Sequence, residues 1–185
     1  MTNRMPQQHK LRTPLSETAV AALRAGDSVL LSGVIYTARD AAHKRIVECI
    51  DSGGRLPFEL SGQVIYYTGP TPTPPGKIIG SAGPTTSYRM DGYAPRLFEL
   101  GLRATIGKGP RSPEVLQAMV RHRAVYLIAT GGAGALLAGC VRACRVIAYA
   151  DLGPEAVHEL EVKDFPVLVA NDIHGGDIYA RSAQK

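Results

Sequence analysis

Residues 83–91, GPTTSYRMD, place two threonines, an arginine and an aspartate where a helix is expected to begin. The Gly-Pro pair is typical of a strand end, and the apolar positions that follow have helical spacing. A helix N-terminus exposes free N–H groups and a partial positive charge, so it attracts carboxylates and phosphates. If both are helical, Thr85 and Arg89 share one face there. The segment is therefore either an anion site or a helix capped by Thr85 or Thr86 whose arginine is solvated or paired with Asp91.

Two further cationic side chains follow strand-like sequence. Arg39 lies in TARDAAHKRI, at the joint between a strand and a helix that Asp40 could cap, and Lys108 lies in the glycine turn of TIGKGPR. Arg39 could instead pair with a surface carboxylate. The Lys108 turn is not a P-loop, because its glycine spacing is one residue too long and Gly109 replaces the required Ser or Thr. His43, on the helix after Arg39, is expected to be structural or merely exposed.

Other motifs match known sites incompletely. TGGAGALLAG at 130–139, with Asp151 about 20 residues after its first glycine, imitates a dinucleotide fingerprint but has Leu137 in place of the third glycine. The turn from Gly131 to Gly134 is therefore either an anion cradle or tight packing. Cys140 and Cys144 lack the second cysteine pair of a Cys₄ site. NDIHGGD at 171–177 reads as a turn rather than a metal site, and the role of His174 stays open.

Bulk composition indicates one globular domain. The chain has 185 residues, 45% hydrophobic and 20% charged, with a net charge of +5. We expect an N-terminal arm over 1–15 and a single domain over 16–185. The basic residues are scattered and only 6% of residues are aromatic, which argues against nucleic-acid binding. Three cysteines and a start without a signal-peptide core predict a reducing cytoplasm.

Strand-like and helix-like segments alternate along the chain, which predicts a mixed α/β fold. The uncharged run 124–141 contains four glycines, so it is expected to be a strand, a turn and a helix and not a membrane span. Pro95 interrupts the helix projected after residue 86, so the first turn is a separate element or the helix kinks there. The expected helices are 15–27, 39–50, 112–122 and 134–143. The expected strands are 28–38, 63–70, 77–82, 103–109, 124–130, 145–151 and 156–172.

TARDAAHKRI, GPTTSYRMD and GKG, in this order, resemble the β subunit of two-subunit class I fumarases and its relative in L-tartrate dehydratase. One-chain class I fumarases carry the same module as their C-terminal domain. The resemblance runs from about residue 15 to about residue 180. It implies a swivelling β/β/α domain, a mixed sheet packed with helices.

The resemblance also implies a shared active site. In the family, an α subunit holds a [4Fe–4S] cluster through three cysteines, and one iron binds the substrate as a Lewis acid. By position, Arg39, Arg89 and Lys108 would grip the dicarboxylate, and Thr85 would be the base that removes the C3 proton. The acid would be an aspartate of the α subunit, and no cluster or metal would bind to this chain alone. The implied assembly is an α2β2 hetero-oligomer, or a β homodimer when isolated.

The sequence therefore predicts a hydro-lyase subunit, active only with its α subunit, that hydrates fumarate reversibly to (S)-malate, a tricarboxylic acid cycle reaction. Fumarase is favoured because RMDGY and NDIHGGD look more like its β subunits. The alternatives are an L(+)-tartrate dehydratase β subunit forming oxaloacetate, a non-catalytic anion- or nucleotide-binding module, and a structural subunit whose arginines only dock a partner.

Overall fold

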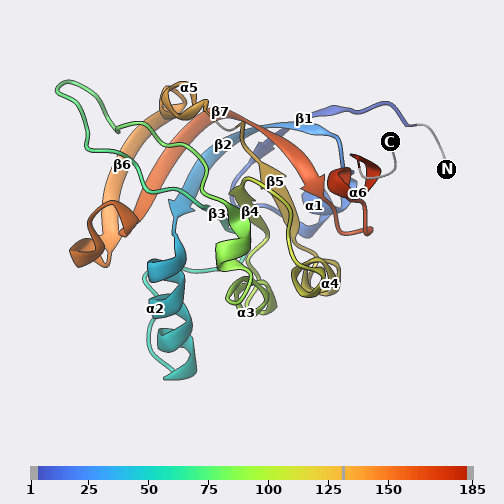
Figure 1. Cartoon of the computed structure of the whole chain (residues 1–185), viewed down its shortest axis with the longest axis horizontal. Coiled ribbons are helices and arrows are strands. Elements are labelled where there is room, and N and C mark those ends of the chain that lie inside the picture. The colour runs from blue at the N-terminus through green and yellow to red at the C-terminus, as the bar shows by residue number, and fades with distance from the viewer. Residues whose placement is uncertain (1–3, 131, 183–185) are drawn as a thin grey trace.

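The computed structural model describes residues 4–130 and 132–182, which form a seven-stranded sheet covered by helices (Figure 1). The strands are β1 (Gln8–Arg12), β2 (Ser28–Thr37), β3 (Val64–Tyr66), β4 (Ala104–Gly107), β5 (Val125–Ile128), β6 (Val141–Ala148) and β7 (Val157–Asn171). The α-helices are α1 (Glu17–Ala22), α2 (Asp40–Asp51), α3 (Ala94–Glu99), α4 (Pro113–His122), α5 (Gly134–Ala138) and α6 (Ile178–Ser182). Two 3₁₀ helices, η1 (Ser87–Met90) and η2 (Ala150–Glu155), complete the described elements.

The long strand β7 closes the sheet on itself. Strands β1 to β5 pair side by side and parallel. Strand β7 runs antiparallel to β5, to β2 and to the outer strand β6. The pairings β2–β3–β4–β5–β7–β2 therefore form a closed five-stranded barrel, with β1 and β6 attached outside it. Closure leaves five of the seven strands without a free edge.

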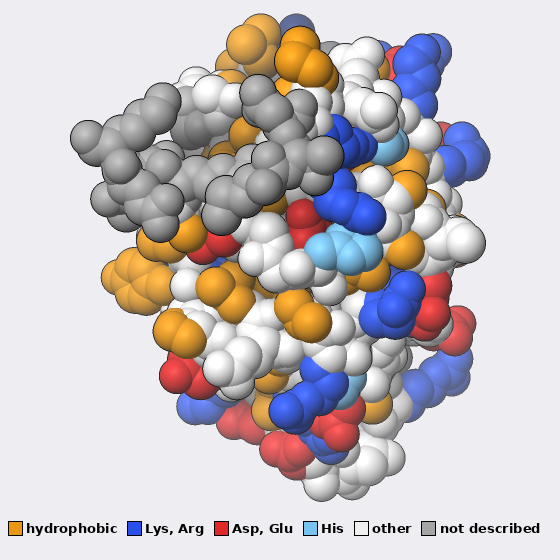
Figure 2. Space-filling view, turned by 90° about the vertical axis from the view of Figure 1, so that its right-hand side faces the viewer, with side chains coloured by type: hydrophobic (Ala, Val, Ile, Leu, Met, Phe, Trp, Pro, Cys, Tyr) orange, Lys and Arg blue, Asp and Glu red, His pale blue; other side chains and the backbone are white. Residues whose placement is uncertain are grey.

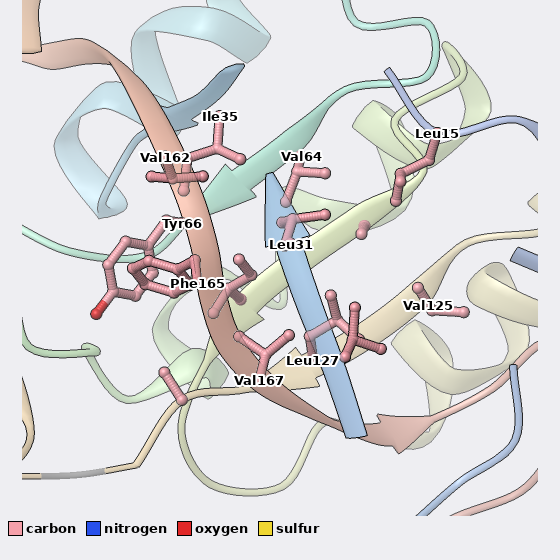
Figure 3. Close-up of a cluster of buried hydrophobic side chains, with 14 of the residues drawn as sticks. Leu15, Leu31, Ile35, Val64, Tyr66, Val125, Leu127, Val162, Phe165 and Val167 are labelled. Carbon is pink, nitrogen blue, oxygen red and sulfur yellow. The ribbon is translucent and has the colours of Figure 1, made fainter. Parts of the chain in front are cut away.

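The inside of the barrel is apolar. Alternate residues of β2 are buried, as expected for a strand with one face in a core. Figure 3 shows side chains from several strands turned toward one another, among them Leu31, Val64, Leu127 and Phe165. Each of these four is at most 1% exposed. Burial of such side chains contributes about 1.5–3 kcal/mol each to stability.

A second apolar layer lies between the outer face of the parallel strands and helices α2, α3 and α4. It contains Ile65 and Tyr126 from the strands and Tyr67 just after β3, with Ile46 and Phe98 among the helical residues. In Figure 1 these three helices lie below strands β3 and β4, whereas α5 and strand β6 lie toward the top of the view. The predicted β/β/α architecture, a mixed sheet packed with helices, is confirmed.

Most of the predicted elements are present. Ser16 caps α1 by accepting from the backbone N–H of Ala19, and α4 begins at Pro113 after the cap Ser112. Of the two alternatives at Pro95, the separate first turn is confirmed, because η1 ends before α3 begins. Pro95 sits in the first turn of α3, where its missing N–H is not needed.

Several predictions about secondary structure differ from the structure, including the strands over 63–70 and 145–151, which end earlier, at Tyr66 and Ala148. No strand forms over 77–82, because the N–H of Ser81 bonds the side chain of Thr71 and its carbonyl accepts from the N–H of Thr71, which closes a loop. The helix predicted over 134–143 ends at Ala138, and residues 141–143 belong to β6. Within the expected arm, residues 8–12 form β1 and pair with β2.

The surface mixes side chains of both charges. On the face in Figure 2, Lys and Arg side chains are interspersed with acidic and apolar ones. Within residues 4–130 and 132–182, no helix has the length and apolar character needed to cross a bilayer.

Candidate functional site

The predicted site residues follow the carboxyl ends of neighbouring parallel strands. Arg39 comes two residues after β2, and Lys108 comes directly after β4. Strand β3 lies between these two strands, with β2 and β4 as its parallel neighbours. Loops at the carboxyl ends of parallel strands are where α/β proteins commonly bind ligands.

The segment 83–87 lies across the carboxyl ends of β3 and β4, which we call the edge of the site, and joins the threonines to Lys108. The N–H of Thr85 donates to the carbonyl of Tyr67 at 2.6 Å, just after β3. The Lys108 N–H donates to the carbonyl of Thr85 at 3.3 Å, and the Ser87 N–H donates to the carbonyl of Lys108 at 2.9 Å. Thr86 and Lys108 accordingly form a parallel bridge. Thr85 and Lys108 are therefore neighbours in space although they are 23 positions apart in the sequence.

Glycine at position 107 permits this contact. A Cβ at Gly107 would collide with the Ser87 hydroxyl and lie 3.0 Å from the Tyr67 ring. Because β4 ends in a residue without a side chain, η1 can approach the strand and place Ser87 against it.

Asp40 links the two arginines. Arg89 Nη2 donates to Asp40 Oδ2 at 2.8 Å, and Arg39 Nη2 lies 3.8 Å from Asp40 Oδ1. Arg39 Nη2 is also 3.1 Å from Glu155 Oε1. The Arg39, Asp40 and Glu155 side chains are 22%, 32% and 26% exposed, and that of Arg89 is 42% exposed. Such partly exposed pairs contribute little stability, so both guanidinium groups can exchange a carboxylate of this chain for one of a ligand.

Several details of the sequence interpretation are wrong. Thr86 occupies the N-cap position of η1 without a side-chain capping bond, and Thr85 lies outside the helix, so Thr85 and Arg89 do not share a helix face. Arg89 pairs with Asp40 and not with Asp91. Asp40 is the first residue of α2, and Arg39 takes the cap position. Arg39 also lies against a partly exposed carboxylate, that of Glu155, which does not decide whether it binds a ligand.

His43 supports the backbone at Arg39. Its ring is fully buried, and Nδ1 lies 2.8 Å from the Arg39 carbonyl oxygen, which can only accept, so Nδ1 carries the proton. The pKa of His43 is lowered to about 4, chiefly by burial and also by the positive charge of Arg111, while the hydrogen bond to the Arg39 carbonyl and the charge of Asp40 act in the opposite direction. Nε2 has no hydrogen-bond partner among the described residues. Of the two expectations for His43, the structural one is confirmed.

Sequence reasoning missed Arg111, whose side chain is completely buried. It pairs with Asp91, with 2.6 Å between Nε and Oδ1. Burial acts to lower the pKa of Arg111, but the Tyr67 hydroxyl and the Asp91 carboxylate outweigh it and raise that pKa. No local pattern separates this arginine from the scattered surface ones, because its partner lies 20 positions away.

The glycine-rich turn fits the tight-packing interpretation. The N–H of Ala82 donates to the carbonyl of Gly134 at 3.1 Å, and a Cβ at Gly134 would lie 2.9 Å from the Gly83 nitrogen. The turn therefore packs directly on the start of the 83–91 segment. Gly131 lies outside the described residues.

The loop NDIHGGD is a hydrogen-bonded turn. The Asp172 carboxylate accepts from the backbone N–H groups of Ala25, His174 and Gly176. The His174 ring bonds the carbonyl of Ala21. Within the described ranges, no three His, Cys, Asp or Glu side chains are grouped to hold a metal ion. The three cysteines are free and partly buried.

The fold is a mixed α/β module with cationic side chains at the carboxyl ends of its parallel strands, and comparison with known proteins identifies its family. The family model described as "Fumarase C-terminus" matches residues 2–182, so the chain belongs to this family. A "Putative L(+)-tartrate dehydratase subunit beta" of Methanocaldococcus jannaschii is 42% identical, covering 92% of this chain and 91% of that protein. "Fumarate hydratase 2" of Leishmania major is 40% identical, covering 94% of this chain and 30% of that protein.

A third relative, "Fumarate hydratase class I, aerobic" of Escherichia coli K12, is 40% identical over 80% of this chain and 28% of its own length. The chain thus spans less than a third of these fumarate hydratases and nearly all of the tartrate dehydratase subunit. The resemblance to class I fumarase and tartrate dehydratase β subunits is confirmed.

Proposed function

We propose that this protein is the β subunit of a hydro-lyase that converts fumarate reversibly to (S)-malate in a site shared with an α subunit. The observation that carries the proposal is the position of Thr85 against Lys108 at the edge where Arg39 and Arg89 share Asp40. These are the four residues on which the family resemblance places substrate binding and proton removal.

The charges suit a C4 dicarboxylate. Arg39, Arg89 and Lys108 supply three cations, and Asp40 and Glu155 balance two of them. A dianion that displaces these carboxylates gains charge-assisted hydrogen bonds of about 1.5–3 kcal/mol each. The fork of a guanidinium also fixes the orientation of a carboxylate, which a single ammonium does not.

Thr85 is the proposed base. In the direction from malate to fumarate, its deprotonated oxygen takes the C3 proton, the electron pair of that C–H bond forms the C2–C3 double bond, and the C2 hydroxyl leaves as water with a proton from an acid of the α subunit. A threonine hydroxyl can act in this way only if nearby positive charge lowers its pKa. We assign this role to the charges of Lys108, whose backbone N–H bonds the backbone carbonyl of Thr85, and of the two arginines.

The α subunit is proposed to hold the [4Fe–4S] cluster, because the described residues of this chain offer no ligand set for it. Two observations support a partner chain. One relative is named a subunit beta, and this chain matches less than a third of the length of the fumarate hydratase relatives. We propose an α2β2 assembly, with a β homodimer when the chain is isolated, and a location in the reducing cytoplasm. The ligand is a small dicarboxylate, not nucleic acid.

The test uses the complex of this chain with its α subunit, assembled without oxygen. The isolated chain should be inactive, and the complex should hydrate fumarate. Thr85→Ala should abolish turnover while leaving the melting temperature unchanged, and Thr85→Ser should retain part of the turnover. Thr86→Ala is the matched control and should keep the activity. Full activity of Thr85→Ala would remove Thr85 from the chemistry, and activity of the isolated chain would refute the shared site.

A second candidate substrate is L(+)-tartrate, because the Methanocaldococcus relative covers nearly the full length of both chains. Tartrate carries one more hydroxyl than malate, and no residue placed here discriminates that group. Rates of the complex with fumarate, malate and L(+)-tartrate decide between the two. Nucleotide binding by the isolated chain at micromolar affinity would instead favour a non-catalytic module.

A further inference from the structure

A buried cation lies between the two segments that carry Thr85 and Lys108. Arg111 follows the Lys108–Gly109 turn, and its Nε donates to Asp91 Oδ1 just after η1. The other oxygen of Asp91 accepts from the backbone N–H of Ser112 at 2.7 Å. Asp91 therefore holds the chain after the lysine turn through both of its oxygens.

Two tyrosines enclose the same guanidinium. Arg111 Cζ lies 5.4 Å from the centre of the Tyr67 ring and 5.0 Å from that of Tyr126. The Tyr126 hydroxyl donates to the carbonyl of Gly109 at 2.9 Å and lies 2.8 Å from the Ser87 hydroxyl. One cluster thus contacts the lysine turn, the start of η1 and strand β5.

The geometry of the cluster requires arginine. Nη1 donates to the Thr105 hydroxyl on β4 at 3.1 Å while Nε holds Asp91. The two bonds leave from different nitrogens of one planar group that also lies against an aromatic face, whereas an ammonium has a single nitrogen that cannot occupy both positions. Buried ion pairs add little net stability compared with apolar packing. The strong effect of this pair is to set the relative position of the segments that it joins.

We propose that Arg111, together with Asp91, is a positioning residue that holds Lys108 beside Thr85. Arg111 is fully buried and acts through the backbone bonds between residues 85–87 and Lys108. The predicted effect on substrate binding rests on the proposed function, whereas the predicted effect on the order of the backbone does not.

The test compares Arg111→Lys with Arg103→Lys. Arg103 precedes β4 at its other end, is 15% exposed, and bonds Glu17 and the carbonyl of His122, so the same change is made away from the site. In Arg111→Lys, hydrogen exchange at the amides of Ser87 and Lys108 should accelerate about tenfold or more while amides of β2 stay protected. In the complex, KM for the dicarboxylate should rise about tenfold with a smaller change in kcat. Arg103→Lys should change neither.

The outcomes separate the two proposals. Unchanged exchange at Ser87 and Lys108, or an equal increase throughout the barrel, would overturn the role of Arg111. A wild-type complex that acts on none of the three dicarboxylates would refute the proposed function, and exchange would still decide on Arg111. If Arg111→Lys does not fold, Asp91→Asn removes the same ion pair and should give the same local pattern of exchange.

Discussion

Buried His43 leads to a quantitative prediction about pH. A histidine protonates with a pKa of about 6.5 when unfolded and about 4 in the folded chain. The unfolded state therefore binds more protons between these values. Stability from neutral His43 is fully present above pH 6.5 and is lost as the pH falls toward 4. At about 1.4 kcal/mol for each tenfold change in proton affinity, the loss is about 3 kcal/mol.

The variant His43→Asn isolates this contribution. Its amide N–H can still donate to the Arg39 carbonyl, but the side chain cannot take up a proton in this range. Loss of ring packing against Tyr67 and Tyr93 lowers the stability of the variant equally at every pH. Protonation of carboxylates affects both proteins and cancels in the comparison.

Urea unfolding of both proteins at pH 7.5, 6, 5 and 4 provides the measurement. The wild type should lose about 3 kcal/mol relative to the variant between pH 7.5 and 4. NMR should show the His43 ring neutral down to about pH 4. A constant difference between the two proteins, or a ring that titrates near pH 6.5, would refute the argument from burial.

Two further substitutions test the anion-binding edge, each with a matched control. Arg89→Ala should leave the free energy of unfolding within about 1 kcal/mol but reduce kcat/KM of the complex roughly 10- to 100-fold, through loss of a charge-assisted bond. Arg96→Ala removes an equally exposed arginine on α3 and should leave both the free energy of unfolding and kcat/KM essentially unchanged. Gly107→Ala forces a methyl group against the Ser87 hydroxyl and should cost about 1–3 kcal/mol of stability, measured by urea unfolding, whereas Gly92→Ala has open space and should have little effect. Unimpaired kcat/KM of Arg89→Ala, or equal stability of the two alanine variants, would contradict the site described here.

The sequence alone determined the order of most elements and the identity of the candidate site residues. Periodicity places Arg39 and Lys108 directly after buried strands, and parallel strands bring their carboxyl ends to one edge, so a common location follows from local pattern. A capping bond is also local, because the side chain bonds a backbone N–H only three residues away, as Ser16 does at α1. The caps expected of Asp40 and of Thr85 or Thr86 nevertheless did not form.

Tertiary structure alone decided which groups meet. Closure of the barrel by β7, the pairing of Arg89 with Asp40 across 49 positions and the burial of Arg111 against Asp91 join residues far apart in the chain. Local propensity carries no information about such contacts, because their energy arises only once the barrel and the helices on its outer face bring the partners together. For the same reason, the sequence could name Thr85 as a reactive candidate, but only the fold places it against Lys108.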